Sequence, residues 1–453
     1  MAIDSELLSR IQMAFTLSYH ILFPTLTIGL AWFLAFLEFL HLRTQKTIYR
    51  QHYDFWSKIF AITFGMGVVS GIVLSYEFGT NFGRFSEAAG NVIGPLMGYE
   101  VLSAFFLEAG FLGIMLFGWN RVSPKLHFFA TCMVAFGTMM SAFWILSANS
   151  WMQTPAGHEF IDGKFFVKSW WDVVFNPSFP YRFSHMVVAS FLTTAFFVLG
   201  VSGWMLWKKK NEAFAKLSFT CGIWFALITA PVQIFIGDLH GLNVLEHQPM
   251  KVAAMEAVWD TQKGAPFTLF AWPNMEKETN DFAITIPKAA SLILTHDLEG
   301  ELVGLKSVPP EDRPNVPLVF FSFRVMVGIG MLMLLTAVIG GYLAIRKKLF
   351  DKPKFFRWCV LMAPSGFIAT VAGWWVAEVG RQPYLVYGLY RTSEGFSRIA
   401  PERVLESLML FVLTYGLLLI AYLFYLFRLV RRGPATPPSE QNESSPTLAK
   451  GEA

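Results

Sequence analysis

The sequence predicts an all-α integral membrane protein, a bundle of about nine transmembrane helices with one long outward-facing loop. Its 453 residues are 54% hydrophobic and only 15% charged, whereas soluble domains carry roughly 25% charged residues. Nine apolar runs have the length of about 20 residues that crosses the hydrocarbon core of a bilayer. Basic residues gather in alternate connections between these runs, which is the pattern of the positive-inside rule.

The nine runs divide the chain into four parts. The first six helices occupy 1–239, a long polar connection follows over 240–316, and the last three helices occupy 317–430. The tail, 431–453, is rich in Pro, Ser and Glu and is expected to be disordered. The predicted helices span 14–40, 55–78, 94–118, 126–149, 184–207, 217–239, 317–345, 357–379 and 404–428. A structureless connection as long as 240–316 would be unusual, so we expect a functional element there.

The distribution of basic residues sets the expected orientation. Alternate connections carry clusters such as the three lysines at 208–210, while the first of the opposite connections has Arg84 alone. The connection before the ninth run, with Arg391 and Arg398, is a partial exception. We therefore expect the N-terminus and the long connection outside and the C-terminus in the cytoplasm.

Composition also excludes some classes of site. Cys132, Cys221 and Cys359 lie in or beside apolar runs without CxxC spacing, so disulfides, covalent haem and iron–sulfur clusters are not expected. The basic residues sit beside apolar runs, so the net charge of +4 does not indicate nucleic-acid binding. The first ten residues lack the basic region of a signal peptide, so we expect the N-terminus to be retained.

Two histidines and one methionine are candidate metal ligands. His20 and His185 fall within or at the rim of a membrane run, away from basic clusters. Neutral imidazole is a common haem ligand, although a hydrogen bond between helices is an equal alternative for each histidine. Met326 enters the seventh run from the same side as His185, so the two could face each other across a haem. Most methionines are structural, but His/Met ligation makes a low-spin iron suited to electron transfer.

Acidic residues in the membrane runs are candidate proton carriers. Glu100 and Glu108 lie in the third run. On an ideal helix they are separated by about 12 Å and by about 80° in azimuth. This spacing favours two successive proton stations rather than one dyad, and the alternative is that one of them bonds to a neighbouring helix. Glu38, nearer the cytoplasmic rim, is interpreted as an ordinary polar group.

Charged residues also flank the eighth and seventh runs. Glu378 ends the apolar part of GWWVAEVGRQPY, and Arg381 follows three residues later. Charges at this depth usually mark a site with a partner or cofactor. Arg324 stands two residues before Met326. Arginine matches carboxylates such as haem propionates, and an anchor at the membrane interface is an equal alternative for each arginine.

Seven segments occur in an order that is typical of one family. They are LSRIQMAFTLSYHILFPTLTIG, FGTNFG, GYEVLSAFFLEAGFLGIMLFGW, ALITAPVQIFIGD, KVAAMEAVWDTQ, FSFRVMVG and GWWVAEVGRQPY. With them the chain, from about residue 5 to 430, resembles subunit I of the cytochrome bd-type quinol oxidases.

The resemblance implies three haems. His185 and Met326 would hold a low-spin haem b that receives electrons from quinol. His20 and Glu378 would ligate the two high-spin haems, a second haem b and a third haem, where O2 is reduced. Which of the two residues holds which haem is left open.

Other positions match residues around the haems. Trp374, one turn before Glu378, would lie near the haems, and Arg324 and Arg381 would lie close to propionates. Glu100 and Glu108 would conduct protons, with Glu100 close to the pair of high-spin haems.

The long connection matches the family's outward Q-loop. Lys251 and Glu256 would be its quinol-site residues. The second half of the loop, between about 286 and 318, is short, as in the cyanide-insensitive branch, so the third haem is expected to be haem d or haem b. Tyr384 replaces a tryptophan found in many members, and little consequence is expected.

The implied function is that of a terminal respiratory oxidase. It would oxidise quinol at the outer face and reduce O2 to water with cytoplasmic protons, contributing to the proton gradient. The implied partners are a homologous membrane subunit II, in many members a small single-span subunit, and membrane lipid. The implied location is the bacterial cytoplasmic (inner) membrane, with the N-terminus and Q-loop periplasmic. The alternative is a proton-coupled secondary transporter, against which the lack of an inverted repeat argues.

Overall fold

The computed structural model describes residues 4–435 and confirms the predicted bundle of nine membrane-spanning segments. Within those residues, nine helical segments are long and apolar enough to cross a membrane. They are α1 (Ser5–Thr44), α2 (Thr47–Thr80), α3 (Gly83–Glu100) continuing into α4 (Phe106–Phe117), α5 (Pro124–Gln153), α7 (Phe179–Trp207), α8 (Glu212–His247), α11 (Val316–Ile345), α12 (Pro353–Leu361) with α13 (Ser365–Val379), and α15 (Pro401–Arg432).

The helices are longer than the apolar runs, since each includes polar residues at one or both ends. Helix α3 begins at Gly83, 11 residues before the predicted start at 94, and α8 was expected to end at 239 and continues to His247. Helix α15 reaches Arg432, so the first two residues assigned to the tail are helical, and 436–453 lie outside the described residues. The eighth span is broken between α12 and α13 just before Pro364. Proline lacks a backbone N–H and disfavours helix at the residue before it.

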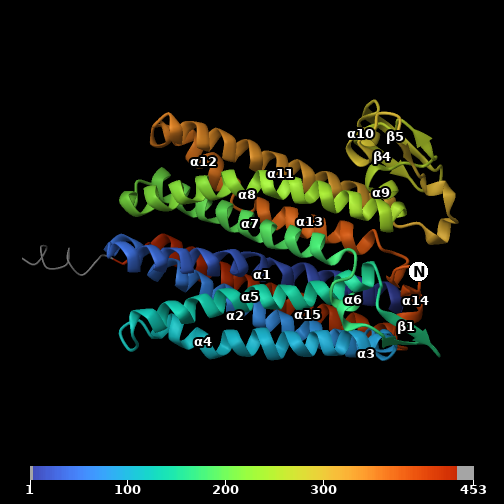
Figure 1. Ribbon diagram of the computed structural model, residues 1–453, viewed down its shortest axis with the longest axis horizontal. Coiled ribbons are helices and arrows are strands. Elements are labelled where there is room, and N and C mark those ends of the chain that lie inside the picture. The colour runs from blue at the N-terminus through green and yellow to red at the C-terminus, as the bar shows by residue number, and fades with distance from the viewer. Residues whose placement is uncertain (1–3, 436–453) are drawn as a thin grey trace, which may run out of the picture.

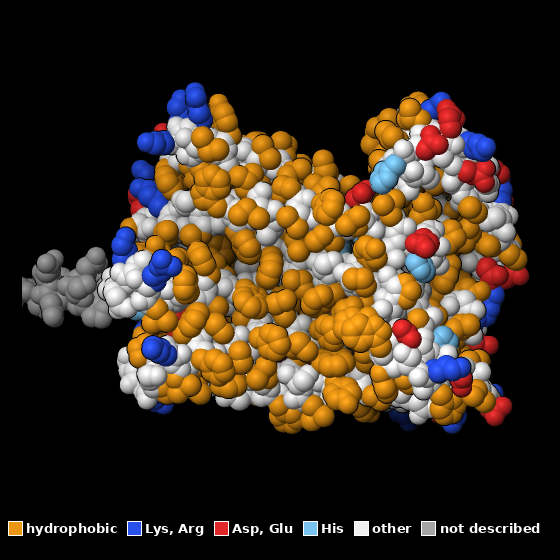
Figure 2. All heavy atoms as spheres, viewed as in Figure 1, with side chains coloured by type: hydrophobic (Ala, Val, Ile, Leu, Met, Phe, Trp, Pro, Cys, Tyr) orange, Lys and Arg blue, Asp and Glu red, His pale blue; other side chains and the backbone are white. Residues whose placement is uncertain are grey.

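The bundle has two chemically different ends. Figure 1 shows the spans side by side, with the N-terminus and the elements between α8 and α11 at one end, here called the loop end. The other end carries the last turns of α1, α7, α11 and α15, and Figure 2 shows Lys and Arg side chains gathered there. We call it the basic end. Hydrophobic side chains cover the surface between the two ends (Figure 2).

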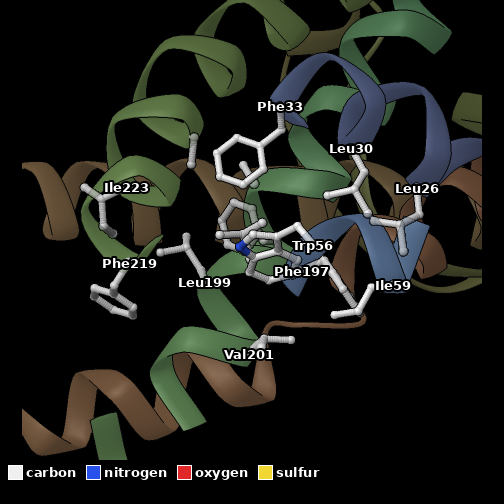
Figure 3. Close-up of a cluster of buried hydrophobic side chains, with 14 of the residues drawn as sticks. Leu26, Leu30, Phe33, Trp56, Ile59, Phe197, Leu199, Val201, Phe219 and Ile223 are labelled. Atoms are coloured by element: carbon white, nitrogen blue, oxygen red, sulfur yellow. The ribbon is translucent and has the colours of Figure 1, made fainter. Parts of the chain in front are cut away.

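The most enclosed helices are α1 and α7, which lie at the centre of the bundle. Trp56 of α2 is fully buried and packs edge-on against Phe33 of α1 and Phe197 of α7 (Figure 3). Gly29 of α1 allows α7 to approach, because a Cβ there would lie 2.3 Å from Thr194 Oγ1 and 2.7 Å from the Ser190 carbonyl oxygen. Backbone contact of this kind is the usual way in which membrane helices associate.

Short elements fold over the loop end. The connection between α8 and α11 is structured, with α9 (Pro249–Glu256), α10 (Ala289–Thr295) and an antiparallel hairpin of β4 (Phe267–Asn274) and β5 (Thr279–Ile286). The other short elements are β1 (His158–Ile161), β2 (Lys164–Val167), α6 (Trp170–Val174), β3 (Gln262–Lys263), β6 (Glu301–Leu302), β7 (Tyr384–Val386), β8 (Tyr390–Arg391) and α14 (Thr392–Gly395). The strands pair two by two, β1 with β2, β3 with β6 and β7 with β8.

The contact at Gly29 makes a testable prediction. Gly29→Ala is expected to destabilise the protein by about 1–3 kcal/mol, because the new methyl group overlaps the backbone of α7. Gly65→Ala on α2 is the matched control, since a Cβ there meets nothing within 4 Å. Thermal unfolding of the purified protein in detergent measures both. Equal melting temperatures for the two variants would contradict the close approach of α1 and α7.

Candidate functional site

Unpaired polar atoms gather in a compartment between α7, α8, α11 and α13, toward the loop end. Each of α8 and α13 packs against both α7 and α11. Buried polar atoms are normally hydrogen-bonded, yet several here have no partner among the described residues: Arg182 Nε, His185 Nδ1, Gln233 Oε1, His240 Nε2, Trp374 Nε1 and Arg381 Nε. Such a set fits a bound group that has a large apolar body and a polar edge.

His185 and Met326 lie on opposite helices of this compartment. The ring of His185, on α7, faces α8, where a Cβ on Gly237 would lie 3.4 Å from its Cε1. Its Nε2 is 3.2 Å from the Gln233 side-chain nitrogen. Met326, on α11, faces α13, where a Cβ on Gly373 would lie 2.7 Å from its sulfur. The two predicted ligands therefore line the same four-helix compartment.

His20 is held by one ring nitrogen. Its Nδ1 lies 2.9 Å from Ser70 Oγ on α2, and a Cβ on the neighbouring Gly71 would lie 3.2 Å from its Cε1. A hydrogen bond at one ring nitrogen orients a metal-binding histidine and leaves the other nitrogen for the metal. Among the described residues Nε2 has no hydrogen-bond partner, which is compatible with that use.

Glu378 lies where α13 meets α5. One of its oxygens accepts from Asn149 Nδ2 at 2.8 Å and from Gln153 Nε2 at 3.3 Å, and the other accepts from Arg381. Trp375, also on α13, donates to Ser18 Oγ at 2.8 Å. Ser18 is two residues before His20, so α13 contacts α1 close to both predicted high-spin ligands.

Lys251 is connected to Glu378 through one glutamine. The lysine is 2% exposed, and its Nζ donates to Gln153 Oε1 at 2.6 Å and to Gln248 Oε1 at 2.7 Å. Gln153 in turn donates to Glu378. Burial lowers the pKa of Lys251 well below its ordinary value, and the nearby charge of Arg182 lowers it further.

Glu256 has a different environment from Lys251, although both are on α9. Its carboxylate is paired with the guanidinium of Arg324 at 2.7 Å. Arg324 also donates to the Thr268 carbonyl oxygen at 2.7 Å and lies over the ring of Phe267. Burial raises the pKa of Glu256, while the charge of Arg324 acts in the opposite direction. The partner of Arg324 in the structure is thus this carboxylate, and a place for Arg324 beside a propionate stays a prediction.

Glu100 and Glu108 both contact α5, and the azimuthal difference of about 80° was expected for an uninterrupted α-helix. Ser141 Oγ donates to Glu100 at 2.8 Å, and a Cβ on Gly137 would lie 2.5 Å from Glu108 Cγ. Gly137 and Ser141 are four residues apart and lie on one face of α5. A π-helical turn, Val101–Phe105, separates the two glutamates and turns less per residue than an α-helix.

The family model described as cytochrome bd terminal oxidase subunit I matches residues 8–434. The chain belongs to this family. Cytochrome bd-II ubiquinol oxidase subunit 1 of Escherichia coli (strain K12) is 34% identical, over 98% of this chain and 99% of the relative. Cytochrome bd ubiquinol oxidase subunit 1 of Bacillus subtilis (strain 168) is 36% identical, over 95% and 94%. The solved bd oxidase from Geobacillus thermodenitrificans superposes with a TM-score of 0.89 at 33% identity, covering 95% of this chain and 99% of that one.

The cofactor of the cytochrome bd family can be compared with the chemistry of the compartment. The family consists of haem-containing, multi-pass proteins of the bacterial inner membrane. Imidazole and thioether groups are common donors for haem iron, and the Glu378 carboxylate is an additional oxygen donor. Arginine and indole N–H groups are suitable partners for its propionates. The donor set and the unpaired polar atoms therefore fit bound haem.

Several polar residues of this site escaped the sequence analysis. His240 was assigned to a connection, but it lies on α8 with its Nε2 buried, and its ring centroid lies 5.4 Å from that of His185. The signal that could have found it is the helical sequence GDLHGLNVLEH, which continues α8 beyond the apolar run. Gln153, Asn149 and Ser141 carry no charge, so nothing in the sequence separates them from other polar residues on the predicted helices.

Proposed function

We propose that this chain is the haem-carrying subunit of an oxidase that oxidises quinol at the loop end and reduces O2 to water. The proposal is carried by one observation: the chain aligns with cytochrome bd subunits over nearly its whole length and has donor residues that fit haem in the same fold. No feature of the described residues favours the secondary transporter considered above.

Four residues would hold the haems. His185 and Met326 would ligate the low-spin haem b, and His20 and Glu378 would ligate the two high-spin haems, a second haem b and a third that is haem d or haem b. When bound, the haems supply one-electron transfer and the reduction of O2. Arg381 would balance the charge of Glu378 and bind a propionate, and Trp374 would offer its indole N–H.

Quinol oxidation requires groups that take two protons, and Lys251 and Glu256 are suited to this. Burial moves the pKa of the lysine down and that of the carboxyl up, so both approach the range in which a group can accept and release protons near neutral pH. Lys251 and Glu256 face different partners. We therefore propose that each residue accepts one of the two quinol protons, on opposite sides of α9. Arg324 would orient Glu256, and Gln153 would orient Lys251.

The basic end is proposed to face the cytoplasm, by the positive-inside rule, with the loop end in the periplasm. Protons for the formation of water would then enter at the basic end and pass Glu108 and then Glu100. Both glutamates face α5. Each positive charge carried from the basic end toward the loop end in this way works against a membrane potential worth about 2.3 kcal/mol per 100 mV.

The proposed partners are a homologous membrane subunit II and a small single-span subunit. The helices least covered by the rest of the chain are α15 and the pair α3 and α4. Their apolar residues would face subunits or lipid. Exposed examples on α15 are Leu410, Leu413, Leu417, Ile420 and Phe424.

The haem assignment is tested by spectroscopy of the purified oxidase. The wild type is expected to show haem bands in a reduced-minus-oxidised spectrum, and quinol is expected to drive O2 uptake. Met326→Leu should convert the low-spin haem to a high-spin form, because leucine has no ligand atom. Met333→Leu is the control, since Met333 is a buried methionine seven residues further along α11.

Two results would count against these assignments. A wild-type spectrum without haem bands would refute the oxidase function itself. A Met326→Leu protein that keeps an unchanged low-spin spectrum would refute only the ligand.

Glu256 is tested by the pH dependence of quinol oxidation. Its carboxylate must be deprotonated to accept a proton, so turnover should fall as the pH drops through its raised pKa. Glu256→Gln cannot titrate, so it is expected to lose this acidic limb and to raise the quinol KM or lower kcat. Steady-state kinetics over a range of pH measure both effects.

The control is Glu278→Gln, which removes a carboxylate from the same loop, where Glu278 pairs with Arg313 at 2.6 Å. Wild-type kinetics in the Glu256 variant at every pH would remove this residue from the quinol site.

A further inference from the structure

A second buried acid lies at the basic end, outside the sites described so far. Glu38 on α1 is 1% exposed and His127 on α5 is 2% exposed. Glu38 Oε1 lies 2.7 Å from His127 Nδ1, and Glu38 Oε2 accepts from Thr131 Oγ1 at 2.6 Å. Glu38 was interpreted from the sequence as an ordinary polar group near the cytoplasmic rim, and its partners come from a helix nearly 90 residues away in the chain.

Two hydroxyl groups extend this cluster toward α4. Tyr53 OH lies 3.0 Å from Thr131 Oγ1 and 3.2 Å from the Met115 carbonyl oxygen. Each hydroxyl has one proton and at least two acceptors within reach, so reorientation of the hydroxyls can reverse the direction of the hydrogen bonds. A proton relay needs this property, whereas a cluster that only holds the helices together does not.

The cluster lies between the basic end and Glu108. Met115 is seven residues after Glu108, which corresponds to about 10 Å of helix toward the basic end. On α5, Thr138 follows Thr131 by two turns on the same face, and Ser141, the partner of Glu100, follows Thr138 by one turn. The order from the basic end is therefore Glu38, Glu108 and Glu100.

The basic-end side of the cluster is covered by a thin layer of side chains. The indole of Trp119 packs edge-on against His127 with centroids 4.4 Å apart, and the guanidinium of Arg50 lies 3.5 Å from the centre of that indole. His127 Nε2, beneath this cover, is buried without a hydrogen-bond partner among the described residues. A buried donor or acceptor without a partner is costly, and His127 Nε2 is free to exchange a proton because no hydrogen bond from the described part of the chain occupies it.

A purely structural role does not need these residue types. Hydroxyl or amide side chains could join α1, α2 and α5 without the cost of burying a carboxylate. A carboxylate and an imidazole that share one proton can instead take up a second proton and release one. The other ionisable groups around the pair are Arg50, Tyr53 and Asp54 on α2, His41 on α1, Cys132 on α5 and Glu108 on α4.

We propose that Glu38 and His127 form the proton-loading station of this chain, which receives protons at the basic end and passes them through Thr131 and Tyr53 toward Glu108. This inference rests on the proposed oxidase function. One proton enters the pair for each that leaves it toward Glu108, so the charge of the pair is restored after every transfer.

The test uses the purified holo-oxidase with three variants. Glu38→Gln and Thr131→Val are expected to lower O2 reduction per haem about tenfold or more. The loss should grow as the pH rises, because protons become scarce. Thr131→Ser keeps the hydroxyl and should retain wild-type turnover. Reduction of the haems by quinol without O2 should stay normal in all three, because that step takes no proton from the basic end.

Two reference variants make the result specific. Glu108→Gln should slow turnover in the same way. Glu77→Gln removes another buried carboxylate, which accepts from Thr16 at 2.5 Å at the loop end of α2, and should leave turnover unchanged. If Glu38→Gln fails to assemble with haem, Tyr53→Phe takes its place beside Thr131→Val.

The outcomes separate the two proposals. Unchanged turnover and an unchanged pH profile in the Glu38 and Thr131 variants, with a slow Glu108 variant, would overturn the loading station and leave the oxidase function intact. A melting temperature that falls while turnover per haem stays normal would also overturn it, because that is the result of a structural clamp. A wild-type protein that quinol cannot reduce would overturn the oxidase function and the station with it.

Discussion

The cost of placing a polar group in hydrocarbon determines the organisation of this chain. Water cannot solvate a donor or acceptor at membrane depth, so each one needs a partner inside the protein or a bound cofactor. The middle of the bundle follows this rule with aromatic and aliphatic packing around α1 and α7. Three groups of polar exceptions bear on the proposed function: the compartment around His185, the glutamates that face α5, and the pair at the basic end. In each group we propose that function, rather than folding, justifies the cost.

Much of the architecture could be predicted because it depends on local composition. Twenty apolar residues in a row specify a membrane helix regardless of their neighbours, and all nine segments were found in this way. The polar ends of the helices could not be placed, because a helix that leaves the hydrocarbon is no longer marked by hydropathy. That limit hid His240, which lies in the last two turns of α8.

The parts of the site that escaped prediction depend on contacts between distant segments. Lys251 and Glu256 are five residues apart and were assigned to one quinol site, yet Lys251 points to α5 and Glu256 to α11. Glu38 seemed unimportant until α5 supplied His127 and Thr131. Sequence spacing gives the direction of a side chain relative to its own helix, but the identity of the partner comes from the packing of the bundle.

The π-helical turn at Val101–Phe105 separates one membrane span into two registers. Residues before it and residues after it belong to different helical wheels, because the turn contains one residue more than an α-helix needs. The loop-end half can therefore keep Glu100 against Ser141 while the basic-end half keeps Glu108 against Gly137. A single helical-wheel projection of the whole span would assign the residues on one side of the turn to the wrong face. Substitutions before and after the turn therefore have to be interpreted on separate helical wheels.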